Sequence, residues 1–178
     1  MANGDQNINR NVRRLNWRQI LVHFLAAWLL TYASELFGYF RNIPFMEVLM
    51  KRDSNFTFQY IKSKNLGTTD IYSYALFVNE VWLIGLLLAF LISLNLSLKR
   101  RWWWGNSLIV IILVYFIKFA YNHFIGNHTG KWFSTISNFP IHPSVDAFVV
   151  VGGLSIIGGF WLFFSRKVAA SIERANKL

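Results

Sequence analysis

Four long apolar stretches dominate this 178-residue chain, and each is long enough to cross a lipid bilayer. An α-helix rises about 1.5 Å per residue, so about 20 apolar residues span the hydrocarbon core of a membrane. The expected helices are Gln19–Phe40, Ile71–Leu98, Trp103–Ile125 and Val145–Ser165. The sequence therefore predicts an all-α polytopic membrane protein, a single domain over residues 1–178 with four transmembrane helices in an antiparallel bundle.

The first apolar stretch follows a basic segment, as the apolar region of a secretory signal peptide does. It is longer than the apolar region of such a peptide usually is. We therefore interpret it as a true membrane span.

Charge and composition narrow the class of protein further. Charged residues make up 15% of the chain, against about 25% in soluble proteins, and the formal net charge is +10. Basic loops of membrane proteins determine topology and face anionic lipid, so we favour this explanation of the charge over nucleic-acid binding. Because the chain has no cysteine and its histidines show no tight ligand spacing, we expect no metal site and no cofactor.

Lysine and arginine are distributed unequally between the two ends of the predicted helices. Eleven lie near the chain termini or in the short turn before Trp102, and six lie in the outer loops 41–70 and 126–144. Cytoplasmic loops are enriched in these residues, so we expect both termini in the cytoplasm and the protein in the cell (inner) membrane. Tryptophans at the cytoplasmic helix ends are typical of an interfacial belt, and they are Trp17, Trp102, Trp103 and Trp104.

The segments outside the four stretches have their own patterns. Pro44 suits a first helical turn, and Phe45 and Val48 then share a face, which favours a short interfacial helix in loop 41–70. The polar segment 93–97 is expected to reach the membrane interface. The basic tail after Ser165 is expected to continue the fourth helix along anionic headgroups, with docking of a cytosolic protein as the alternative.

Ionisable side chains inside the apolar stretches are the candidate functional residues, because a charge in hydrocarbon costs a few kcal/mol or more. Glu35, Glu80 and Lys118 lie on three helices, roughly 8 to 14 Å below the outer boundary at the helical rise. Opposite charges at one level predict a shared polar site. Polar neighbours that would complete this site are Asn79, Tyr115, Asn122 and His123, and weaker candidates are His23 and Asp146.

The three charges allow two interpretations. In the first, Lys118 neutralises one carboxylate as a structural ion pair while the other carboxylate is protonated or solvated. In the second, an outward-facing aqueous cavity binds a cation, a proton or a small polar molecule. We favour the structural interpretation.

Small residues recur at helical spacing on two of the stretches. Lipid provides no hydrophobic drive for helix association, so small side chains are needed to let helix backbones approach. We expect these residues to lie in contacts inside the bundle, with a subunit interface as the alternative. They are Gly152, Ser155 and Gly159 on the fourth stretch, and Ala27, Thr31 and Ser34 on the first.

These observations favour a small non-enzymatic membrane protein that acts as an accessory or scaffold subunit, or as a pore-forming subunit. It would assemble with copies of itself or with a membrane or cytosolic partner at its basic cytoplasmic face. A small transporter or an ion or proton channel that uses Glu35, Glu80 and Lys118 is the alternative. A membrane enzyme or a quinone-linked subunit ranks lowest, because the sequence shows no nucleotide-binding glycine loop and no zinc-binding histidine pair.

Overall fold

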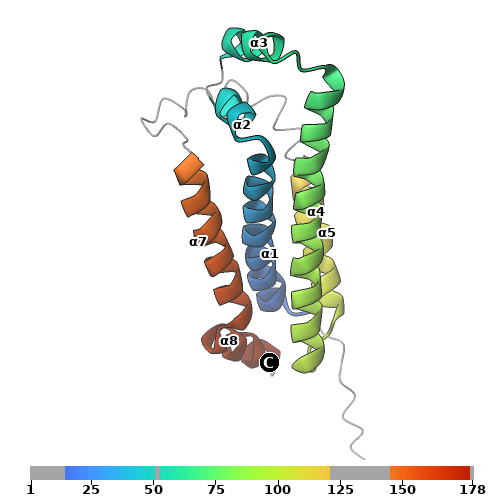
Figure 1. Ribbon diagram of the computed structural model, residues 1–178. Coiled ribbons are helices and arrows are strands. Elements are labelled where there is room, and N and C mark those ends of the chain that lie inside the picture. Colours follow the sequence, from blue (N-terminus) through green and yellow to red (C-terminus); the bar gives the residue numbers. More distant parts are fainter. Residues whose placement is uncertain (1–14, 51–52, 121–144, 177–178) are drawn as a thin grey trace, which may run out of the picture.

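The computed structural model describes residues 15–50, 53–120 and 145–176, and all regular elements in these ranges are helices (Figure 1). The predicted all-helical class is therefore confirmed. The elements are α1 (Trp17–Gly38), the 3-10 helix η1 (Tyr39–Asn42), α2 (Ile43–Met50), α3 (Ser54–Ser63), α4 (Thr68–Lys99), α5 (Gly105–Ala120), α7 (Val145–Phe164) and α8 (Arg166–Asn176).

Two helical segments are long and apolar enough to cross a membrane. One is the run Trp17–Leu49, which continues from α1 through η1 into α2, and the other is α4. The segments Phe148–Phe164 and Arg166–Ala175 are long and apolar enough when they are taken together. A bend of 47° separates them, and as one segment they would provide a third span. The helix α5 is apolar, but its 16 described residues are fewer than a membrane-spanning helix needs.

The helix α1 lies at the centre of the arrangement. It is placed between α7 on one side and α4 and α5 on the other, and it contacts all three (Figure 1). Small side chains make this close packing possible, because Ala26, Ala27 and Ala33 are almost completely buried. The main apolar cluster joins residues of these helices, among them Leu30, Trp82, Leu86, Val110, Val114 and Phe163.

Two short helices cross the ends of the long ones (Figure 1). At one end, α3 packs through Tyr60 and Ile61 on Phe45 of α2 and Tyr74 of α4. At the other end, α8 buries Ala169 and Ile172 against Trp102. The sequence predicted the α2 region and the helical tail, but α3 was not expected.

The turns that follow α3 and α4 share one hydrogen-bond pattern. Asn65 and Arg101 have positive φ angles of 49° and 57°. The next residue in each turn donates its backbone N–H to a carbonyl of the preceding helix, Leu66 to Ile61 at 3.0 Å and Trp102 to Ser97 at 2.8 Å. This left-handed end satisfies the last helix carbonyls and turns the chain sharply.

Several predicted helix boundaries shift for local reasons. The third predicted helix was expected to begin at Trp103, but α5 begins at Gly105, where a Cβ atom would lie 2.5 Å from the Trp103 ring. The fourth predicted helix was expected to extend to Ser165 and to continue into the basic tail. The corresponding helix α7 ends at Phe164, and the tail forms a separate helix, α8, at an angle to it. Residues 121–125 of the third predicted helix and the loop 126–144 lie outside the described residues.

Candidate functional site

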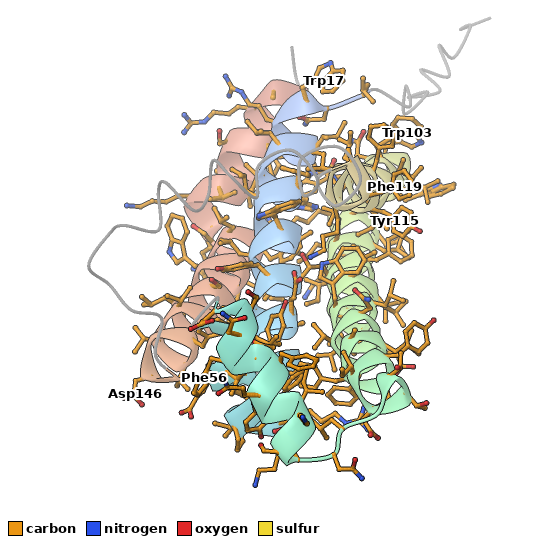
Figure 2. All side chains as sticks on the ribbon, turned by 90° about the horizontal axis from the view of Figure 1, so that it is seen from above. Trp17, Phe56, Trp103, Tyr115, Phe119 and Asp146 are labelled. Carbon is orange, nitrogen blue, oxygen red and sulfur yellow. The ribbon has the colours of Figure 1, made fainter. Side chains whose placement is uncertain are left out.

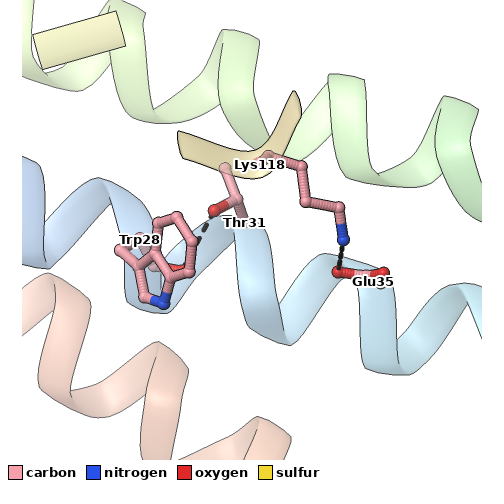
Figure 3. Close-up of polar contacts among 4 residues, drawn as sticks. All are labelled: Trp28, Thr31, Glu35 and Lys118. Atoms are coloured by element: carbon pink, nitrogen blue, oxygen red, sulfur yellow. Dashed lines mark hydrogen bonds and ion pairs between the residues drawn. The ribbon is translucent and has the colours of Figure 1, made fainter. Parts of the chain in front are cut away.

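An ion pair between α1 and α5 is the charged contact inside the described bundle. The Lys118 Nζ atom donates to the Glu35 Oε2 atom at 2.5 Å, and the two side chains retain 18% and 21% of their exposure respectively. Figure 3 shows Lys118 reaching from α5 to Glu35 on α1. The pair therefore lies at the margin of the packed core rather than at its centre.

The position of Lys118 follows from the sequence of α5. Val110 and Val114 are completely buried, and Lys118 continues this row one helical turn later. Tyr115 and Phe119, which flank this row, are exposed. The ammonium group also lies 5.8 Å from the centre of the Trp82 ring on α4, a distance at which the ring's negative face attracts a cation.

The side chains around Glu35 are occupied by local hydrogen bonds. The Thr31 hydroxyl donates to the Trp28 carbonyl at 3.0 Å (Figure 3). The Ser34 hydroxyl donates to the Leu30 carbonyl at 2.9 Å. Both hydroxyls bond to their own helix, so they present no free donor toward the ion pair.

Glu80 does not join this pair. Close contacts of Gly38 with Val78 and of Ser34 with Gly85 place this part of α4 at the same level as Glu35. However, Val78 and Trp82 face the bundle, and Glu80 projects from the opposite side of α4, where it is exposed. The predicted common level of the three charges is present, but only two of them meet.

The polar neighbours predicted for the site are also spread apart. Asn79 and Tyr115 are exposed, and the Tyr115 ring lies 6.3 Å from the Trp82 ring. Asp146 is exposed at the start of α7. Figure 2 shows Tyr115 and Asp146 at separate edges of the molecule. Asn122 and His123 lie outside the described residues.

A second polar group, which sequence reasoning did not assemble, is fully buried near the opposite end of the bundle. Gln19 on α1 donates to the Ser97 hydroxyl at 2.8 Å and accepts from the Asn106 amide at 2.8 Å. The His23 Nδ1 atom and the Ser93 hydroxyl share a hydrogen bond of 2.7 Å. The Ser107 hydroxyl is hydrogen-bonded to the hydroxyls of Ser93 and Ser97 on α4, at 2.8 and 2.9 Å. We call these six residues the buried polar network; they are Gln19, His23, Ser93, Ser97, Asn106 and Ser107.

The buried polar network could have been anticipated from its spacing. Gln19 and His23 are four residues apart, as are Ser93 and Ser97, so each pair lies on one face of its helix. The segment 93–97 was instead expected at the membrane interface, because its serines and asparagine are compatible with water. Ser93 and Ser97 are in fact completely buried, since the polar side chains of α1 and α5 provide their partners.

The remaining predicted residues are placed mostly in helix contacts. Gly152 packs against Phe37 and Gly159 against Leu30 and the Ala26 carbonyl, and both glycines and Ser155 are buried. Ala27 and Thr31 are buried as well, and Ser34 touches Gly85 of α4. These two rows of small residues lie inside the bundle.

The tryptophans expected in an interfacial belt differ in their placement. Trp17 and Trp104 are exposed, and Trp103 is partly buried over Gly105. Trp102 departs from the expected belt, because the turn after α4 directs it inward between α1 and α8, where it is 9% exposed.

Among the described residues, every buried side-chain nitrogen or oxygen has a hydrogen-bond partner, and no group of three His, Asp or Glu side chains gathers as a metal site requires. This arrangement can hold helices together and can balance one charge with another. No protein-family model, curated protein or solved structure matches the chain.

Proposed function

We propose that this chain is a small integral protein of the cell (inner) membrane, with four spans and cytoplasmic termini. In this proposal it acts without enzymatic activity, as an accessory or scaffold subunit or as a pore-forming subunit. The apolar length of the segment Trp17–Leu49 and of α4 supports membrane insertion. The helices α5 and α7, with the residues that follow α5, would provide the remaining two spans.

The arrangement of the helix ends supports the proposed topology. The start of α1 and the helix α8 lie together, because the Asn16 side-chain amide donates to the Ile172 carbonyl at 3.1 Å. The turn between α4 and α5 lies at the same end, where Trp102 packs on α8. The basic residues assigned to the cytoplasm are therefore gathered on one side, and the described ones are Arg18, Lys99, Arg100, Arg101, Arg166, Lys167 and Arg174.

The observation that carries the non-enzymatic role is the internal pairing of the polar groups. Lys118 is bonded to Glu35, and the side chains of the buried polar network bond to one another. A binding or catalytic site needs polar groups that remain available to a substrate. Groups that satisfy each other across three helices instead fix the register of those helices.

The basic surface of α8 gives the proposed subunit a place to bind a partner. Arg166, Lys167 and Arg174 are exposed, while Ala169 and Ile172 anchor the helix to the bundle. We propose anionic lipid headgroups as the first occupant of this face and an acidic cytosolic protein as the second.

A transporter or ion channel is the second candidate function. The observation in its favour is that Glu35, Glu80 and Lys118 share one level and retain partial or full exposure. In this alternative the pair would open to admit an ion or a proton.

Ion flux in reconstituted liposomes separates these functions. We would compare the unmodified protein with the double variant Glu35→Gln/Lys118→Gln, after verifying by thermal unfolding that the variant is folded. A scaffold gives no flux of protons, Na⁺, K⁺ or Cl⁻ in either form, and a passive pore conducts equally in both. Flux that the folded double variant loses would contradict the proposal and support transport through the charged site.

A further inference from the structure

The exposed face of α4 carries a carboxylate in the middle of an apolar surface. Leu76, Leu83, Leu87 and Leu91 are each between 41% and 57% exposed, and Glu80 is exposed among them. At about 100° per residue, these side chains share the side of α4 that faces away from α1. No described residue forms a hydrogen bond or an ion pair with Glu80, and Lys118 is already bonded to Glu35.

This placement is costly for a helix in a membrane. Helix α4 has 32 residues, and 12 of them precede Glu80, so the carboxylate is far from either helix end. Intramembrane acidic side chains normally face other protein groups or water, because lipid offers no hydrogen bonds. The geometry of α4 therefore calls for a partner that covers this face.

The spacing of the exposed side chains indicates that the partner on this face is another helix. Leu76, Glu80, Leu83 and Leu87 follow each other at intervals of four, three and four residues, which is the seam of a two-helix coiled coil. With Glu80 at an a position, Leu76 and Leu83 occupy d positions and Asn79 the flanking g position. Val78 and Gly85, at f positions, and Trp82, at a c position, pack inside the bundle on the other side of the helix.

We propose that this face binds a second copy of the chain, with the two α4 helices parallel and related by a two-fold axis. This inference rests on the proposed insertion into the membrane. In such a seam an a-position side chain inserts among the a, d and flanking g positions of the facing helix. Glu80 then lies beside both Glu80 of the partner subunit and Asn79 of the partner subunit.

The polar groups that the two copies bring to this contact can bond to each other. Two neighbouring carboxyl groups share one proton, because two adjacent negative charges repel each other strongly in a medium of low dielectric. Each carboxyl group also accepts a hydrogen bond from the amide of Asn79 across the interface. A single polar layer in an apolar seam specifies the register of two helices, which a purely leucine surface does not.

Energy transfer between donor-labelled and acceptor-labelled copies in liposomes tests the inference. The label is attached at Ser171→Cys, an exposed position on α8 in a chain that has no other cysteine. The unmodified seam should give a dimer, and Glu80→Gln should keep it because glutamine both donates and accepts. Glu80→Lys should weaken self-association by about fivefold or more, because two ammonium groups then face each other.

Mixing the Glu80→Lys variant with the unmodified protein gives the most specific test of the proposed contact. Copies with Glu80→Lys should pair with unmodified copies, because a Lys–Glu contact replaces the carboxyl pair. The matched control is Glu47→Lys, the same charge change at an exposed residue of α2, which should leave self-association unchanged. The inference would be overturned if the protein were a monomer in the membrane, or if Glu80→Lys left its self-association unchanged. A chain extracted from membranes by alkaline carbonate would instead contradict the proposed function itself.

Discussion

At the scale of single residues, polar side chains in this bundle act in pairs whose members come from different helices. Lys118 of α5 meets Glu35 of α1, and Gln19 of α1 meets Ser97 of α4 and Asn106 of α5. Removing one member leaves the other without its partner in a region with little water. The loss should therefore exceed the loss from removing both members.

The Glu35–Lys118 pair gives the first prediction. Glu35→Gln or Lys118→Gln alone should lower the free energy of unfolding by about 1–3 kcal/mol, less than for a fully buried pair because both groups keep some exposure. The double variant should lie closer to the unmodified protein than the sum of the two single changes. A double-mutant cycle by thermal or denaturant unfolding in detergent measures this coupling, and additive losses would show that the two charges act independently.

The buried polar network gives the second prediction. Gln19→Leu removes one donor and one acceptor and leaves the Asn106 amide without that partner, so it should destabilise the protein by about 1–3 kcal/mol. Gln59→Leu on α3 is the matched control, because Gln59 is exposed and should change stability by less than about 0.5 kcal/mol. Equal unfolding midpoints for the two variants would argue against a stabilising network.

At the scale of elements, the existence of the long helices was predictable from the sequence, but that of α3 and the rotation of each helix about its axis were not. Long apolar runs and the Pro44 segment indicate helices directly. Helix α4 is apolar on nearly all sides, so nothing in its sequence distinguishes the side of Trp82 from the side of Glu80. Which carboxylate Lys118 would meet therefore depends on the packing of Gly85 against α1, a contact between helices that sequence spacing alone does not reveal.

The close approach of α1 and α4 gives the third prediction. A Cβ atom on Gly85 would lie 2.2 Å from the Ser34 Oγ atom and 2.6 Å from its Cβ atom, so Gly85→Ala must push the helices apart. We expect a loss of about 1–3 kcal/mol, partly recovered by adding Ser34→Gly. Gly153→Ala on α7 is the control, because no atom lies within 4 Å of its Cβ position. Unfolding that is insensitive to Gly85→Ala would contradict this packing.

At the scale of the whole molecule, the fold places two chemically different ends on opposite sides of an apolar middle. One end gathers α8, the start of α1 and the turn before α5, and the other carries α2 and α3 (Figure 1). Charge counting predicted this division, because basic residues mark the helix ends that share one side of a membrane. The crossing of α8 over Trp102 was not predictable, since it depends on the turn at Arg101.

Labelling single cysteines from one side of the membrane tests the proposed four-span topology most directly, and the chain has no native cysteine to interfere. Cysteines replace Gln59 on α3 and Ser134 in the loop 126–144 for one side, and Lys99 at the end of α4 and Ser171 on α8 for the other. In intact cells, a membrane-impermeant maleimide should label Gln59→Cys and Ser134→Cys, and should label Lys99→Cys and Ser171→Cys only after the membrane is opened. Labelling of Ser171→Cys from outside, or of Gln59→Cys and Ser134→Cys from opposite sides, would contradict the four-span arrangement.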